Sequence, residues 1–194
     1  MRQPLEERSV CISRSKMTVE YPASFMFIAA MNPCPCGYYN HPEKECSCAA
    51  GVVQRYLNKI SGPLMDRIDL HVEVIPVHFK ELAEKNKGEN SSTIRERVIK
   101  ARKIQEIRFQ NQKGIYCNAQ MTSKLVAKHC VISKDGQTLL KVAMEKLGLS
   151  ARAYDRILKV SRTVADLNNS ADIQIEHLSE AIHFRSLDRD NWGK

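Results

Sequence analysis

Four cysteines lie close together in the first third of this 194-residue sequence. They form two Cys-x-Cys pairs, Cys34/Cys36 and Cys46/Cys48, separated by a polar loop that contains His41. In extended or turn backbone, residues i and i+2 project to the same side, so each pair can offer two thiolates to one ion. We therefore predict a structural Zn²⁺ site with four sulfur ligands, in which His41 could replace one thiolate. The alternative is a loop with four reduced thiols.

The other three cysteines, Cys11, Cys117 and Cys130, are isolated in the sequence, and we expect them to be small buried hydrophobic side chains. The longest apolar run, Phe25 to Met31, is far shorter than the ~18–20 residues of a membrane-spanning helix. The first residues also lack the apolar segment of a signal peptide. We expect a cytoplasmic protein without a membrane partner, in which disulfide bonds are not the framework.

The chain has a formal net charge of +8, and its basic residues are concentrated in the second part. Residues 1–80 carry 9 Lys and Arg against 8 Asp and Glu, whereas residues 81–194 carry 21 against 14. A positive field attracts phosphate polyanions, so nucleic acid or a nucleotide is the natural partner class, although a basic solvated surface gives the same composition. One predicted helix concentrates Arg95, Arg97, Lys100, Arg102, Lys103 and Arg108, and we interpret it as a mostly solvated surface, with contact to DNA as the alternative.

The pattern of apolar residues predicts two kinds of structure. The first 80 residues show β-type segments and one short helix, whereas the remainder is helical. Two short strands flank Ser13 to Lys16 as a hairpin, and the continuous run Phe25–Ala30 suits a central strand buried on both faces. The predicted strands are Val10–Ile12, Met17–Glu20, Phe25–Ala30 and Leu70–Ile75, and the predicted helix is Gly51–Ile60.

A polar linker, residues 81–92, separates this part from a small bundle in residues 93–194. Ser133 and Ser150 stand at positions where a hydroxyl can cap a helix N-terminus. The predicted helices are Thr93–Gln110, Thr122–Lys128, Lys134–Leu147, Ala151–Leu167 and Ile175–Leu187.

The printed sequence contains no G-x-x-x-x-G-K-[S/T] phosphate loop and no apolar strand that ends in Asp-Glu. These motifs hold the nucleotide phosphates and Mg²⁺ during phosphoryl transfer. We expect this polypeptide alone not to hydrolyse nucleotide. Its first residues, RQPLE, have the character of a helix inside a domain, so the chain is interpreted as the downstream part of something larger.

Four sequence blocks occur in an order that resembles the carboxyl-terminal part of the magnesium-chelatase-like AAA+ ATPases, in the branch of the bacterial competence proteins. The blocks are RQPLE, ISRSKMTVEYPASFMFIAAMNPCPCGYY, SGPLMDRIDLHVEV and LSARAYDRILKVSRTVADL. The resemblance implies an α/β plus all-α fold: part of an AAA+ α/β core, with the hairpin, a sensor strand and a following strand, and then a helical lid bundle. The family's phosphate loop and magnesium-binding strand would lie upstream, so the chain is either a truncated form or the product of a split gene.

The resemblance also implies three roles at the nucleotide. Asn32, after the sensor strand, is similar to the polar sensor that orients the attacking water; otherwise it is an Asn that caps a strand before Pro33. Arg67 is similar to the arginine finger that reaches a neighbouring subunit's nucleotide; otherwise it forms a salt bridge with Asp66 or Asp69. Arg152 is similar to the second sensor, which touches the γ-phosphate from the lid; otherwise it is a solvated charge at a helix end.

By the same analogy, the hairpin would project into the pore of a ring, where Arg14 and Lys16 would contact DNA phosphates. A turn with two exposed basic residues and no ligand is the alternative reading.

The resemblance implies ATP hydrolysis with Mg²⁺ in a hexameric ring that acts on DNA, by branch migration during natural transformation. This chain would supply the sensor and finger residues to an upstream ATPase portion. The alternative function is a stand-alone zinc-containing nucleic-acid-binding module without ATPase activity. Magnesium insertion into a porphyrin has no supporting feature in the sequence.

Overall fold

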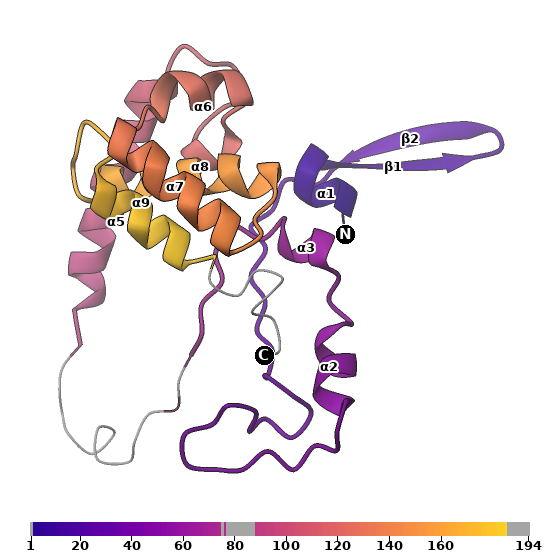
Figure 1. Cartoon of the computed structure of the whole chain (residues 1–194). Helices are drawn as coiled ribbons and strands as arrows, with labels where there is room; N and C mark the ends of the chain where they lie inside the picture. The colour runs from indigo at the N-terminus through magenta and orange to yellow at the C-terminus, as the bar shows by residue number, and fades with distance from the viewer. Residues whose placement is uncertain (1, 75, 77–87, 186–194) are drawn as a thin grey trace. The chain divides into compact units, whose positions relative to one another are not determined.

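The computed structural model of the chain describes residues 2–74, 76 and 88–185 (Figure 1). These residues form two compact units, one that ends at Ile68 and one that begins at Asp69. The described part combines helices with one two-stranded antiparallel sheet, as expected for a fold that mixes α/β and helical parts. Among the described residues, no helix is both long and apolar enough to cross a membrane.

The first unit contains short helices and the predicted hairpin. In the hairpin, the strands pair in register from Ser9↔Pro22 to Arg14↔Met17, so only Ser15 and Lys16 form the turn. Figure 1 shows the two strands extending from α1, with the turn at their far end. The prediction of a hairpin is confirmed. The elements of this unit are α1 (Arg2–Glu7), β1 (Ser9–Arg14), β2 (Met17–Pro22), α2 (Val52–Leu57) and α3 (Gly62–Met65).

The prediction of a buried central strand at Phe25–Ala30 is wrong for this structure. The segment has no regular secondary structure, and Phe25, Met26 and Ile28 are 51%, 83% and 78% exposed. A strand is stable only when neighbouring strands satisfy its backbone N–H and C=O groups. Among the described residues the only strand pairing is β1 with β2, which offers this segment no neighbour. The predicted strand Leu70–Ile75 is also without regular structure over residues 70–74, and Ile75 lies outside the described residues.

The second unit is a helical bundle in which the ends of the predicted helices are found within two residues, except that the last helix ends at His183, and its predicted end, Leu187, lies outside the described residues. Both predicted caps are present: Ser133 Oγ accepts a hydrogen bond from Gly136 N–H (3.1 Å) and Ser150 Oγ from Ala153 N–H (3.3 Å). Most of the predicted linker, residues 81–87, lies outside the described residues. The elements are α5 (Ser91–Phe109), η1 (Asn118–Gln120), α6 (Ser123–His129), α7 (Lys134–Lys146), α8 (Ala151–Leu167) and α9 (Ile175–His183).

Helix α8 lies at the centre of the core of the second unit. Its residues Ile157, Leu158 and Ala165 are almost completely buried and belong to one hydrophobic cluster with Leu140 of α7 and Leu178 of α9. The spacing of these α8 positions places them on one face of the helix. Because burying one such Leu or Ile side chain contributes about 1.5–3 kcal/mol, this cluster accounts for much of the bundle's stability.

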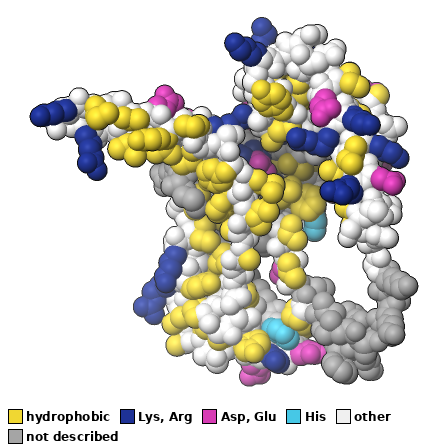
Figure 2. All heavy atoms as spheres, turned by 180° about the vertical axis from the view of Figure 1, so that it is seen from behind, with side chains coloured by type: hydrophobic (Ala, Val, Ile, Leu, Met, Phe, Trp, Pro, Cys, Tyr) yellow, Lys and Arg dark blue, Asp and Glu magenta, His cyan; other side chains and the backbone are white. Residues whose placement is uncertain are grey.

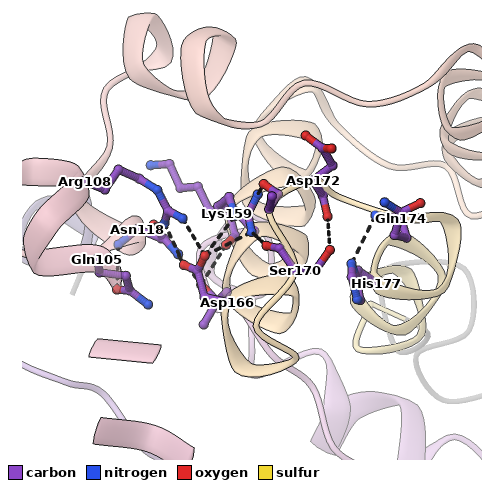
Figure 3. Close-up of polar contacts among 12 residues, drawn as sticks. Gln105, Arg108, Asn118, Lys159, Asp166, Ser170, Asp172, Gln174 and His177 are labelled. Carbon is purple, nitrogen blue, oxygen red and sulfur yellow. Dashed lines mark hydrogen bonds and ion pairs between the residues drawn. The ribbon is translucent and has the colours of Figure 1, made fainter. Parts of the chain in front are cut away.

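A buried carboxylate on the polar side of α8 joins three elements (Figure 3). Asp166 is 1% exposed and accepts two hydrogen bonds from Arg108 of α5, at 2.6 and 2.5 Å. Asn118 of η1 donates a further one at 2.7 Å, and Arg162 Nε another at 3.1 Å. Arg162 also donates to the carbonyl oxygens of Ser170 and Ala171, so the same network holds the loop after α8.

Because of this network, the prediction of a solvated side chain is wrong for Arg108. Arg108, expected on a solvated basic surface, has a side chain only 13% exposed because it pairs with Asp166. The expectation holds for the other five basic residues of α5, which are exposed: Arg95, Arg97, Lys100, Arg102 and Lys103. Two of the isolated cysteines also differ from the prediction, because Cys11 is exposed on the hairpin and Cys117 is only partly buried, whereas Cys130 is buried as expected.

Candidate metal centre

The four clustered cysteines come together in the first unit. Their sulfur atoms all lie within 4.8 Å of one another, and this is the one group of potential metal ligands found among the described residues. The sulfur–sulfur distances are 3.2 Å between Cys34 and Cys36, 3.5 Å between Cys36 and Cys46, and 3.7 Å between Cys34 and Cys46. Cys34 is fully buried, while Cys36, Cys46 and Cys48 are partly buried. The predicted grouping of two Cys-x-Cys pairs is therefore present.

Tight turns in the loop bring the two pairs together. The N–H of Gly37 donates to the carbonyl oxygen of Cys34 at 3.0 Å, which closes a turn around the first pair. Gly37 has φ +84°, a conformation that glycine adopts without steric cost. A second turn follows, closed by a hydrogen bond from His41 N–H to the carbonyl oxygen of Tyr38 at 3.1 Å. These turns reverse the chain, so Cys46 and Cys48 return to the first pair.

His41 does not replace a thiolate in the cluster, which was the alternative for this residue. Its Nδ1 accepts hydrogen bonds from the backbone N–H groups of Glu43 (3.0 Å) and Lys44 (3.1 Å). Its ring also packs edge-on against Tyr38, with 5.6 Å between the ring centroids. The imidazole therefore supports the loop backbone, and the four sulfur atoms form the ligand group without it.

The thiols influence one another's ionisation because their sulfur atoms are in contact. The pKa of Cys36 is lowered to about 5, chiefly by a hydrogen bond from the backbone of Tyr38 and then by the Cys34 thiol. The backbone N–H of Cys36 acts to lower the pKa of Cys48, but burial and the neighbouring thiols outweigh it and raise that pKa to about 12. Without a cation, one thiolate therefore opposes the ionisation of its neighbours. A bound dication would favour the thiolate at every position.

The donor set fits a tetrahedral thiolate site for a metal such as Zn²⁺. With zinc–sulfur distances of ~2.3 Å, a tetrahedron has sulfur–sulfur edges of ~3.8 Å. The three sulfur–sulfur separations of 3.2, 3.5 and 3.7 Å are close to this length. A site with four protein ligands has no open position for substrate, so its contribution would be to hold the loop together.

Two residues expected at the nucleotide lie in the first unit. Asn32 is exposed and lies two residues before Cys34. Arg67 is 9% exposed, and its guanidinium pairs with Glu6 of α1 at 2.8 Å and donates to the carbonyl oxygen of Pro63. Glu6 is therefore an ion-pair partner of Arg67, and Asp69 pairs with Arg156. Glu6 lies 61 positions before Arg67, and no local sequence signal points to it.

The remaining predicted residues lie at exposed positions. Arg152 belongs to the second unit, where it is exposed in the first turn of α8. Arg14 and Lys16 are exposed at the end of the hairpin, where Figure 2 shows dark blue side chains beyond a band of yellow ones.

Comparison with known proteins places these features in a family. Residues 1–82 match the family model described as magnesium chelatase, subunit ChlI, and residues 88–185 match the model of its C-terminal part. The chain is 41% identical over 190 residues to the competence protein ComM of Haemophilus influenzae, and 38% identical over 190 residues to the uncharacterized protein YifB of Salmonella typhimurium. It is also 34% identical over 185 residues to an uncharacterized protein of Mycobacterium bovis. These alignments cover 95–97% of the chain but only 36% of each relative. The chain therefore belongs to the magnesium chelatase ChlI family.

Proposed function

We propose that this chain is the sensor and lid portion of a magnesium-chelatase-type AAA+ ATPase that acts on DNA, by branch migration during natural transformation. The observation that carries the proposal is the 41% identity to the competence protein ComM over 97% of the chain. Residues 1–80 would then be the downstream part of the α/β core, 81–92 a linker and 93–194 the lid. The two family matches, to residues 1–82 and 88–185, support this division. ATP with Mg²⁺ would bind where an upstream ATPase portion is present, in a hexameric ring.

In this proposal Arg67 is the arginine finger. Its guanidinium is paired with the carboxylate of Glu6, and a γ-phosphate of a neighbouring subunit is an anion that could replace it. The charge that spreads over the phosphoryl oxygens in the transition state would attract the guanidinium more strongly than a single carboxylate does. The finger would therefore move from an internal ion pair to the nucleotide.

Asn32 and Arg152 would act on the nucleotide of their own subunit. The exposed amide of Asn32 can donate and accept hydrogen bonds at once, which suits a group that orients a water molecule beside the γ-phosphate. Arg152, in the first turn of α8, offers a guanidinium on a rigid helix for the same phosphate.

The hairpin would contact DNA through Arg14 and Lys16. Both side chains are exposed at the end of the hairpin, where Lys16 is in the two-residue turn. Contacts of this kind neutralise phosphates and position a strand without reading its sequence.

A second candidate function is that of a stand-alone nucleic-acid-binding module with structural zinc. The cluster of Cys34, Cys36, Cys46 and Cys48 favours it, because a four-sulfur site can stabilise a small unit without any nucleotide. The two candidates differ in whether the chain takes part in ATP hydrolysis when the phosphate-loop portion is supplied.

Both candidates predict that the purified chain alone does not hydrolyse ATP above background. The reason is that the printed sequence has no phosphate loop and no strand that ends in Asp-Glu to hold Mg²⁺. Phosphate release should therefore be the same for the wild-type chain and for Arg152→Ala, because both would report only contaminating activity. Turnover that Arg152→Ala removes would contradict this expectation.

The metal assignment predicts about one equivalent of zinc per chain, measured by elemental analysis of protein purified under reducing conditions. Because only thiolates bind zinc, protons compete with the metal, and the occupancy should fall as the pH is lowered. Cys34→Ser should remove most of the zinc, whereas Cys11→Ser is the matched control, since Cys11 is exposed and lies outside the cluster. Hydrogen exchange in residues 33–50 should rise when a chelator removes the metal. Zinc content unaffected by Cys34→Ser would refute the site.

A further inference from the structure

Three of the four residues of the cysteine cluster are accessible from solvent. Cys34 is fully buried, whereas Cys36, Cys46 and Cys48 are partly exposed. Oxidation of a cysteine requires thiolate character and access for the oxidant. A dication in the cluster would hold each sulfur as a thiolate, and the partial exposure supplies the access. The cluster therefore meets both requirements for reaction with a small oxidant such as a peroxide.

The sulfur atoms of Cys36 and Cys46 are well placed for a disulfide bond. They lie 3.5 Å apart, and the two residues are ten positions apart in the sequence. A disulfide has a sulfur–sulfur distance of ~2.05 Å, so an approach of roughly 1.5 Å by side-chain rotation would complete the bond. Because the residues stand at the two ends of the loop, either side chain can rotate without moving the backbone of the other.

A disulfide within the pair Cys34 and Cys36 is less favourable, although their sulfur atoms are only 3.2 Å apart. Pro35 between them has a fixed backbone angle. The hydrogen bond from Gly37 N–H to the carbonyl oxygen of Cys34 closes the turn around the pair. A disulfide needs a dihedral angle of about 90° at its sulfur–sulfur bond, and in so short a ring this angle would distort the turn. Cys36 and Cys46 are therefore the favoured partners.

We propose that the cysteine cluster is a site of reversible oxidation, at which hydrogen peroxide joins Cys36 to Cys46 and releases the metal. In the first step the thiolate of Cys36 attacks a peroxide oxygen: a sulfur–oxygen bond forms, the oxygen–oxygen bond breaks and hydroxide leaves. In the second step the thiolate of Cys46 attacks the sulfur of Cys36, which forms the disulfide and expels a second hydroxide. The two thiolates lose two electrons, the peroxide gains them, and two protons from solvent convert both hydroxides to water.

Oxidation would change what holds the loop together. Two of the four sulfur ligands are lost, so the cluster no longer offers a tetrahedral thiolate site. The disulfide still closes the loop from Cys36 to Cys46, while Cys34 and Cys48 are released from the metal. This oxidation rests on the metal assignment but on neither ATP nor DNA, so it is tested separately from the proposed function.

The test titrates the full chain, loaded with zinc and freed of reductant, with hydrogen peroxide. A chromogenic chelator measures the released zinc, and differential alkylation with mass spectrometry gives the state of each cysteine. Close to one equivalent of zinc should be released, with about two cysteines oxidised for each zinc lost. Peptide mapping should find the disulfide between Cys36 and Cys46. A thiol reductant with added zinc should restore the starting state.

Two variants check the assignment of the partners. Cys46→Ser removes the second nucleophile, so peroxide should leave a sulfenic acid at Cys36, trapped by dimedone, and no disulfide. This measurement does not require bound metal, so it also holds where Cys46→Ser binds zinc weakly. Cys117→Ser is the matched control, because Cys117 is partly buried as well but lies outside the cluster. It should release zinc and form the disulfide as the wild type does.

Hydrogen exchange distinguishes oxidation from simple loss of the metal. A chelator acting on the reduced protein should raise exchange throughout residues 33–50. Peroxide should raise it next to Cys34 and Cys48, but less in residues 37–45, because the disulfide keeps that part of the loop closed.

Retention of zinc by the cluster at peroxide concentrations that oxidise the exposed Cys11 would overturn the inference. A disulfide between any other pair of cysteines would overturn it as well. If the purified chain contains no metal but peroxide still joins Cys36 to Cys46, the oxidation of the thiols is supported and the release of a metal is refuted. None of these outcomes changes the expectations for ATP hydrolysis, which test the proposed function.

Discussion

Replacing Asp166 with alanine is expected to lower the free energy of unfolding of the helical unit by about 3–5 kcal/mol. The carboxylate is 1% exposed and accepts hydrogen bonds from Arg108, Arg162 and Asn118. Its removal leaves two arginine side chains close together in a largely buried site with no anion between them. The loss is large because the charge that remains is uncompensated, even where the intact pair adds little over a well-packed apolar group. Urea unfolding followed by far-UV circular dichroism measures the change.

Asp172→Ala is the matched control for this prediction. Asp172 is an exposed aspartate in the same unit, and its side chain should contribute less than about 0.5 kcal/mol. Asp166→Asn keeps the volume and part of the hydrogen bonding, so it should lose less than Asp166→Ala and provides a folded variant where alanine is not tolerated. Equal urea midpoints for Asp166→Ala and Asp172→Ala would show that the network adds little to stability.

The helical unit could be predicted well from the sequence because its signals are local. The apolar positions of α8 repeat with helical spacing, and Ser150 precedes the helix as a cap, so the range Ala151–Leu167 was predicted without error. Helix α7 is similar, with Ser133 as its cap. The Asp166 network could not be predicted in this way, because Arg108 lies 58 positions from its partner. A helix that is basic around much of its surface gives no sign of which arginine is buried.

In the first unit, the local sequence pattern does not determine whether an apolar segment forms a strand. Residues Phe25–Ala30 have the composition of a buried strand, but a strand also needs neighbours, and the composition carries no information about them. The cysteine cluster was predictable because the spacing within each pair and the turn residues between the pairs are local. The sequence leaves the role of His41 open, because an imidazole can bind a metal ion or accept hydrogen bonds. The structure shows that it accepts hydrogen bonds, from the backbone N–H groups of Glu43 and Lys44.

The roles of Asn32, Arg67 and Arg152 came from the family resemblance, and the structure adds one contact that bears on them. Arg67 is held by Glu6, so any action on a neighbouring nucleotide must compete with that ion pair. Asn32 and Arg152, in contrast, are exposed.

Changing Arg67 to alanine should lower kcat for ATP hydrolysis by about 10³- to 10⁵-fold in the assembled ATPase, with the phosphate-loop portion supplied. The finger acts on the transition state, so nucleotide binding, measured by fluorescence of a labelled ATP analogue, should remain nearly unchanged. Arg67→Lys keeps the charge but cannot form the bidentate contact, so it should rescue little activity. Glu6→Gln is the informative control. It removes the competing carboxylate while leaving Arg67 in place, and hydrolysis should be retained.

Mixed assemblies test whether Arg67 acts across the subunit interface. Subunits that carry Arg67→Ala but an intact phosphate loop should hydrolyse ATP when they are combined with subunits that have Arg67 and a disabled phosphate loop, because each mixed interface then contains one finger and one nucleotide site. Either variant alone should be inactive. Sedimentation of each variant checks that assembly is retained, since Arg67 also joins α1 to the segment around Pro63. Absence of activity in the mixture, with assembly intact, would place Arg67 at the nucleotide of its own subunit or in a purely structural ion pair with Glu6.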